Sequence, residues 1–184
     1  DSRHILESSI EHFKSSLMNL LKSHTETLSQ YGIEYDDIEH LEVTSATELE
    51  FWVKTPNDKA EIEELSTSQV LHEQYWTRTR GVVRTSLEQS LSLLDAYGLE
   101  AEMGHKEVGG VKAKLDDSGK LTHIMEQLEI DWKYSSPLQA ADNELLARII
   151  IKEAFRNNGL DVTFLAKPVD GVAGSGKHIH VGIA

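Results

Sequence analysis

The sequence predicts an α+β fold, with a largely antiparallel sheet covered by helices on one face. Apolar residues recur at three- and four-residue steps from Ile5 to Gln30, which is the spacing of an amphipathic helix. Several later segments are rich in Val, Ile, Thr and aromatic residues and stop at Gly, Pro, Asn or Asp, as strands do. Helices and strands do not alternate strictly, which favours α+β over repeated βαβ units.

The first half of the chain is predicted to hold two helices and two strands. Tyr31-Gly32 ends the first helix, Thr55-Pro56 closes the first strand, and Gly98 stands in the position of a left-handed cap after the second helix. In chain order the expected elements are a helix over Ile5–Gln30, a strand over Glu42–Lys54, a polar linker over Lys59–Thr67, the longest helix over Ser68–Tyr97 and a strand over Glu100–Val108.

The second half is predicted to hold three strands and one helix. Asp116–Gly119 is a turn, and Ser136-Pro137 opens the helix with residues favoured at the cap and the first helical position. Asn157–Gly159 closes this helix. The expected strands are Thr122–Tyr134, Asp161–Lys167 and Lys177–Ala184.

Composition limits the classes of function. The chain has 184 residues, enough for one domain with a core, and its net charge of −13 argues against a nucleic-acid partner. No apolar run reaches about 18 residues, so we expect no membrane partner. The sequence has no cysteine, which excludes thiolate metal sites and fits a cytoplasmic location. It begins without Met and stops within an apolar strand, so we expect a piece of a longer protein.

Like side chains stand two residues apart on predicted strands. Glu48-x-Glu50 is one such pair and His178-x-His180 is another, so each pair points to one face of a sheet. Glu107 and Glu129 lie on the strands between them. Carboxylates that converge on one face repel one another unless a divalent cation lies among them. The pattern therefore predicts a metal site.

A second motif resembles a phosphate-binding loop in its spacing but lacks the other features of one. Gly171–Lys177 has the spacing of a phosphate-binding loop, but His178 stands where that motif needs Ser or Thr. A strand pattern follows, whereas a phosphate-binding loop must lead into a helix. We interpret these glycines as a loop whose backbone comes close to a ligand or to another loop.

Six motifs occur in one order along the chain. They are Glu48-x-Glu50, His105-x-Glu107-Val108, Gln127-x-Glu129-Ile130-x-Trp132-Lys133-Tyr134, Ala140–Asn143, Thr163–Pro168 and Gly174-Ser175-Gly176-x-His178-x-His180. This series resembles the catalytic domain of glutamine synthetase, from about Thr47 to the end of the chain and most strongly over Glu126–His180. The resemblance implies a single partial catalytic domain over residues 1–184, truncated at both ends, with a helical segment at 1–40 and a motif-bearing core at 41–184.

The resemblance also implies two cation sites and several substrate contacts. The ligands of the metal nearest the amino-acid substrate would be Glu50, Glu107 and Glu129. The ligands of the second metal, which grips the ATP phosphates, would be Glu48 and His178. Oxygen ligands with one imidazole suit Mg²⁺ or Mn²⁺. The other implied contacts are Glu102, Tyr134 and His180 for the nucleotide and Gly174 for glutamate. The family's catalytic residues fall outside the chain.

The sequence departs from the family pattern in three places. A long segment, Val108–Glu126, separates Glu107 from the next motif, and we interpret it as an inserted β-hairpin that turns at Asp116–Gly119. A gapless alignment would instead put Lys114 at the third ligand position. The other departures are Ala173, where the family usually has Asn, and Gly182, where it usually has Ser. The pattern is closer to the long, divergent glutamine synthetases than to the short bacterial type.

By this resemblance the parent protein is an ATP- and Mg²⁺-dependent ligase that joins ammonia to glutamate through a γ-glutamyl phosphate, and it forms a homo-oligomeric ring. Two alternatives stay open. One is a glutamate–amine ligase of the polyamine type, which shares these motifs. The other is a glutamine synthetase-like protein kept for structure or regulation, in which lost metal ligands would be expected.

We expect the 184-residue chain alone to make no glutamine. The resemblance places the family's arginines, a further metal-ligand glutamate and the loop that guards ammonia outside this sequence. An assay of the purified chain with glutamate, ammonia and ATP tests the expectation, and steady glutamine production would contradict it.

Overall fold

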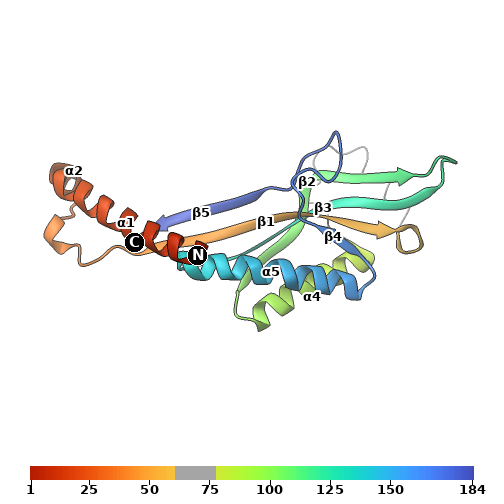
Figure 1. Cartoon of the computed structure of the whole chain (residues 1–184), viewed down its shortest axis with the longest axis horizontal. Helices are drawn as coiled ribbons and strands as arrows, with labels where there is room; N and C mark the ends of the chain where they lie inside the picture. The colour runs from red at the N-terminus through yellow and green to blue at the C-terminus, as the bar shows by residue number, and fades with distance from the viewer. Residues whose placement is uncertain (61–77) are drawn as a thin grey trace. The chain divides into compact units, whose positions relative to one another are not determined.

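The computed structural model describes residues 1–60 and 78–184 (Figure 1). In chain order its elements are α1 (Ser2–Ser23), α2 (Thr25–Gln30), η1 (Tyr35–Asp37), β1 (Val43–Pro56), η2 (Asn57–Lys59), α4 (Gly81–Ala96), β2 (Ala101–Leu115), β3 (Leu121–Ser135), α5 (Pro137–Asn157), β4 (Asp161–Thr163) and β5 (Lys177–Ile183). The chain forms two compact units. Unit 1 comprises Asp1–Ala46, Tyr134–Asp142 and His180–Ala184, and unit 2 comprises the described residues of Thr47–Lys133 and Asn143–Ile179.

The strands form one five-stranded sheet in the order β2-β3-β1-β4, with β5 paired to β1. The pairs β2–β3 and β1–β4 are antiparallel. Glu42 and Ala184 exchange both backbone hydrogen bonds, at 2.7 and 2.9 Å, which is the pattern of antiparallel partners. The prediction of a largely antiparallel α+β sheet is confirmed.

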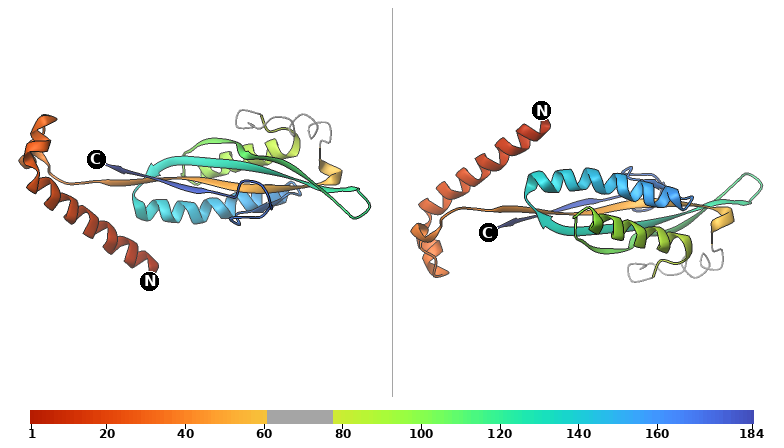
Figure 2. Two further views of the ribbon diagram at one scale, coloured as in Figure 1. Left: turned by 90° about the horizontal axis from the view of Figure 1, so that it is seen from above. Right: turned by 90° about the horizontal axis from the view of Figure 1, so that it is seen from below.

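The larger hydrophobic cluster of unit 2 lies on one face of the sheet. Alternate residues of β1 and β3 point to this face, because successive strand side chains point to opposite sides. The strand residues are Leu49, Phe51, Val53, Leu128, Ile130 and Trp132. They pack against side chains of both α4 and α5, among them Leu87, Leu94, Ile151 and Phe155. The two helices therefore cover the same face, as predicted (Figures 1 and 2).

The predicted β-hairpin with its turn at Asp116–Gly119 is also confirmed, and it makes β2 longer than the predicted strand. β2 and β3 pair from Ala101↔Trp132 to Leu115↔Leu121, with an irregularity between Lys106 and Val111. The turn is held by the Asp116 side chain, which accepts the backbone N–H groups of Ser118 and Lys120 at 2.9 Å each. Gly119 takes a φ of +81°, which favours glycine.

Three predicted boundaries are wrong for local reasons. The helix expected over Ile5–Gln30 is divided at His24, because the Ser23 hydroxyl and the His24 ring both bond to the Leu20 carbonyl and end the first helix there. The strand expected over Asp161–Lys167 stops at Thr163, whose hydroxyl accepts the Leu165 N–H at 3.2 Å.

The helix expected over Ser68–Tyr97 starts later and is not the longest. Residues 68–77 lie outside the described residues, and residues 78–80 are not helical. Arg80 is extended and Gly81 has a φ of +54°, so helical hydrogen bonding cannot continue backward from α4. α4 has 16 residues, against 22 in α1 and 21 in α5. In contrast, α5 begins at Pro137 as predicted.

β5 is a strand, so the glycines before it do not lead into a helix and the phosphate-loop interpretation is excluded. Within residues 1–60 and 78–184, no helix combines the length and apolar character that crossing a membrane requires.

Phe155→Ala should destabilise unit 2 by about 3–5 kcal/mol, because it leaves a cavity beside a buried ring. Phe155 is fully buried and meets Phe51 edge-on at 5.7 Å between ring centroids. Ile149→Ala on the same helix is the control, since Ile149 is 61% exposed and its loss should change stability by no more than about 0.5 kcal/mol. Urea unfolding measures both, and equal effects would contradict the assignment of the core.

Candidate metal centre

The face of the sheet turned away from α4 and α5 carries polar and acidic side chains. Glu48 and Glu50 alternate along β1 with the core residues Leu49 and Phe51. On β3, Glu129 alternates with core residues in the same way. Strand alternation thus places these acidic residues on the face opposite the main core, where Trp52 and Met125 also form a smaller buried cluster with Val169.

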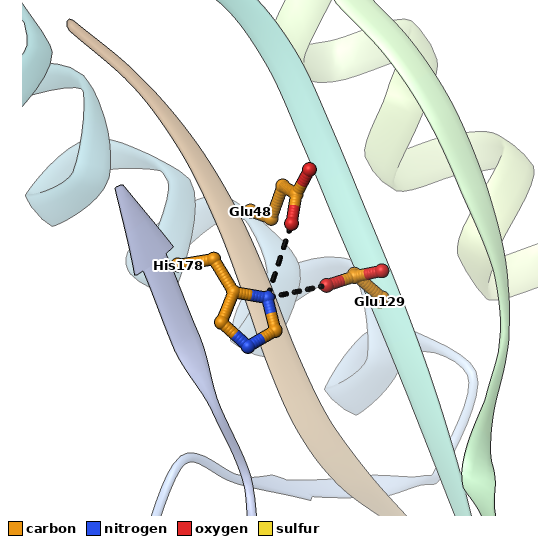
Figure 3. Close-up of side chains that lie close together, drawn as sticks. All are labelled: Glu48, Glu129 and His178. Carbon is orange, nitrogen blue, oxygen red and sulfur yellow. Dashed lines mark hydrogen bonds and ion pairs between the residues drawn. The ribbon is translucent and has the colours of Figure 1, made fainter. Parts of the chain in front are cut away.

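The first cluster consists of Glu48, Glu129 and His178 (Figure 3). His178 Nδ1 lies 3.0 Å from Glu48 Oε2 and 3.6 Å from Glu129 Oε1. The three residues come from β1, β3 and β5, so three separate strands meet at one imidazole. Their possible ligand atoms all lie within 4.8 Å of one another.

The second cluster consists of His105, Glu107 and Glu129. His105 Nε2 lies 3.2 Å from Glu129 Oε2 and 3.5 Å from Glu107 Oε2. The antiparallel register places His105 directly opposite Glu129. Glu107 and Glu129 are both buried, at 8% and 6% exposure. Glu129 therefore belongs to both clusters and turns one oxygen to each histidine.

Glu50 is buried and held by hydrogen bonds rather than placed in the second cluster. Its Oε2 accepts from Gln127 Nε2 at 2.7 Å and from the Gly176 N–H at 2.8 Å. Its Oε1 lies 3.7 Å from His178 Nε2. Gln127 also donates to the Gly174 carbonyl at 2.8 Å. A Cβ atom on Gly176 would come within 2.8 Å of Glu50 Oε1, so the loop approaches Glu50 this closely only as glycine.

The structure thus brings five predicted metal ligands to one face but groups them differently from the prediction. Glu48, Glu129 and His178 gather, with Glu50 beside His178, while Glu107 joins Glu129 through His105. His105 is named within a sequence motif but is not counted among the metal ligands predicted from the sequence. Its spacing of two residues from Glu107 on a strand is the signal that would have placed it on the same face.

The other predicted site residues lie on described elements. Glu102 is exposed on β2, and Gly174 lies in the loop before β5, with its carbonyl bonded to Gln127. Tyr134 and His180 belong to unit 1 and are exposed. The departure at Gly182 has a local reason in unit 1, since a Cβ there would come within 2.6 Å of Thr44 Oγ1.

The carboxylates raise the pKa of both histidines. For His105 the largest cause is the hydrogen bond to Glu129, which outweighs desolvation. For His178, desolvation lowers the pKa, but the hydrogen bond to Glu48 and the charges of Glu50 and Glu129 together raise it. Burial raises the pKa of the nearby Asp131 carboxyl. Protonated imidazoles therefore offset the negative charge of this face without a metal.

The donor set fits a hard divalent cation. Both clusters combine carboxylate oxygens with one imidazole, which are ligands that Mg²⁺ and Mn²⁺ accept. Glu129 Oε1 is buried and accepts no hydrogen bond from the described residues. A buried carboxylate oxygen that accepts no hydrogen bond lowers the stability of the fold unless a positive charge lies nearby. His178 at 3.6 Å partly supplies that charge, and a cation would supply it fully.

Comparison with known proteins gives the same fold and family. The family model described as "Glutamine synthetase, catalytic domain" matches residues 18–184. The glutamine synthetase of Thermus thermophilus is 36% identical over 93 residues, which are 50% of this chain and 18% of that protein. The glutamine synthetase of Streptomyces filamentosus is 37% identical over 95 residues, which are 51% of this chain and 17% of that protein.

Two solved structures share the fold. A GmaS/ADP complex has a TM-score of 0.56 at 20% identity and covers 89% of this chain and 32% of that chain. A novel glutamine synthase homolog has a TM-score of 0.50 at 20% identity, over 90% of this chain and 31% of that chain. The likeness at 20% identity is one of fold. Since the family model covers most of its residues, the chain belongs to the glutamine synthetase catalytic-domain family.

In metal-free protein, His105 should titrate above its ordinary pKa of 6.5, and Glu129→Gln should lower that pKa. NMR titration of the ring signals in EDTA measures this, with the exposed Glu88→Gln as a control that leaves His105 unchanged. A raised pKa means that the folded state binds the proton more tightly than the unfolded state. The stabilisation is therefore complete below pH 6.5 and is lost as the pH rises through the raised pKa. Metal-free stability that rises over this window would contradict the arrangement.

Proposed function

We propose that this chain is part of an ATP-dependent ligase that joins ammonia to the γ-carboxyl group of glutamate through a γ-glutamyl phosphate. The observation that carries the proposal is Glu129, a buried carboxylate that turns one oxygen to the His178 cluster and the other to the His105 cluster. Two adjacent cation sites sharing one carboxylate suit a reaction in which a phosphate and a carboxylate must approach each other. Membership in the glutamine synthetase family supports the same reaction.

The residues that would hold the cations are those on the acidic face. Following the two clusters, we assign Glu107 and Glu129, with His105, to the cation nearest glutamate. We assign Glu48, Glu129 and His178, with Glu50 beside His178, to the cation nearest the ATP phosphates. Mg²⁺ or Mn²⁺ meets the preference of these donors for hard cations. When bound, the cations offset the charge of the phosphates and of the attacking carboxylate.

The remaining residues would position ligands rather than transfer protons. The hydrogen bonds from Gln127 and Gly176 fix the orientation of the Glu50 carboxylate before a ligand binds. The same contacts hold the glycine loop near Glu50, and Gly174 in this loop is the proposed glutamate contact. Glu102, Tyr134 and His180 are the proposed nucleotide contacts, and Tyr134 exposes 68% of its surface, which leaves its ring open to a base.

Ammonia is the acceptor that we propose, because the curated relatives are glutamine synthetases. A glutamate–amine ligase is the second candidate, and the departure at Ala173, beside the proposed glutamate contact, leaves it open. We further propose a cytoplasmic, homo-oligomeric parent protein. Assays of the intact protein with ammonia and with small amines at equal concentration separate the two acceptors.

Glu129→Gln should weaken Mn²⁺ binding at least tenfold, because one substitution removes a ligand charge from both clusters. Calorimetry of the 184-residue chain, with and without ATP, measures this. Glu88→Gln, an exposed residue of α4 paired only with the nearby Arg84 among its described contacts, is the matched control and should bind as the unchanged chain does. Binding that strengthens with ATP would support a nucleotide-linked cation. Equal Mn²⁺ affinity in Glu129→Gln and the control would remove the assignment.

A further inference from the structure

Gln127 is a buried amide within the acidic face of unit 2. It lies on β3 two residues before Glu129, so both side chains point to the same side of the strand. Gln127 is only 1% exposed. Its Oε1 accepts no hydrogen bond from residues 1–60 and 78–184. A buried oxygen without a donor lowers the stability of a fold, so packing within the sheet does not explain an amide at this position.

The amide nitrogen of Gln127 joins two acceptors that come from different segments. Nε2 donates one hydrogen bond to Glu50 Oε2 at 2.7 Å and another to the Gly174 carbonyl at 2.8 Å. An amide nitrogen carries two hydrogens, so it supplies both bonds at once. These partners also decide the orientation of the amide, because the reversed orientation would set its oxygen against a carboxylate and a carbonyl. A glutamate at position 127 would repel Glu50 in the same way.

The hydrogen bonds to Glu50 distinguish its two oxygens. Oε2 accepts from Gln127 Nε2 at 2.7 Å and from the Gly176 N–H at 2.8 Å. Two donors match the two lone pairs of this oxygen. Oε1 lies instead 3.7 Å from His178 Nε2. Oε1 is therefore the atom that the Glu50 carboxylate can offer to a cation beside His178.

The hydrogen bond to Gly174 ties the same amide to the glycine loop before β5. Two other bonds hold this loop to β1: the Gly176 N–H donates to Glu50 Oε2, and the Glu50 N–H donates to the Gly176 carbonyl at 3.2 Å. Gln127 adds a bond from β3 to the loop. The loop, β1 and β3 are therefore connected through one amide group, and a change in its position would move both Glu50 and Gly174.

We propose that Gln127 is a positioning residue for the cation cluster, which sets the oxygen of Glu50 that faces His178 and ties that carboxylate to the backbone of Gly174. A group that orients a metal ligand strengthens cation binding, because the ligand is aligned before the cation arrives. The effect on cation binding rests on the proposed function, whereas the effect on the glycine loop rests on the hydrogen bonds alone.

Calorimetry of Mn²⁺ binding to the 184-residue chain tests the link to the cation. Gln127→Met keeps the length of the side chain but removes both donors, and it should raise the Mn²⁺ Kd at least about tenfold. In a Glu50→Ala background the same substitution should change the Kd by less than about twofold, because Gln127 acts through Glu50. Leu94→Ala, in the core on the other face of the sheet, is the structural control and should leave the Kd unchanged. Equal effects of Gln127→Met in the two backgrounds would overturn the proposal.

Hydrogen exchange of the metal-free chain, followed by NMR, tests the geometry without any cation. The Gly176 amide should exchange at least about tenfold faster in Gln127→Met, because its Glu50 acceptor loses the group that orients it. The Ile130 amide is the internal control, since β3 lies between β2 and β1 and a general loss of stability would speed both amides alike. Equal acceleration of the two amides, or none at Gly176, would overturn the proposal. Failure of the unchanged chain to bind Mn²⁺ would instead count against the proposed cation sites, and hydrogen exchange alone would then decide the role of Gln127.

Discussion

The burial of Glu129 is the constraint on which the acidic face depends. A carboxylate so nearly removed from water must find positive charge, and in this chain it finds two imidazoles, one on each side. One imidazole comes from the strand paired with β3, and the other from the far end of the sequence. The acidic cluster can therefore form only when β2, β3 and β5 are all in register, so the geometry of the sheet sets the geometry of the cluster.

The glycine loop before β5 holds a second buried carboxylate, that of Glu50, on the acidic face. Its backbone donates to Glu50 and accepts from Gln127, so a second buried carboxylate is oriented by peptide groups rather than by charge. Peptide groups can come this close only because Gly176 has no side chain. The loop looks like a phosphate-binding motif in sequence, yet in the fold it holds the buried Glu50 carboxylate in place.

The β2–β3 hairpin extends well beyond the acidic cluster. An irregularity between Lys106 and Val111 separates its outer part from the pairing of His105 with Glu129. A buried ion pair between Lys106 and Glu126, 3.2 Å apart on the alternate face, spans the two strands at this point. A slip of one residue would turn Glu129 into the hydrophobic core, so strong register is a condition for the site.

The sequence by itself determined the strands, the α+β class, the β2–β3 hairpin and the five carboxylate and imidazole candidates, because strand alternation and ordered motifs are local properties of the chain. It did not determine where helices break. His24 ends α1 through side-chain hydrogen bonds, and the extended backbone of Arg80 sets the start of α4; apolar periodicity predicts neither boundary. The grouping of the ligands was decided only by tertiary structure. His105 shares Glu129 because antiparallel register sets them opposite each other, and Glu50 turns to the glycine loop because that loop returns to β1 from 126 residues away.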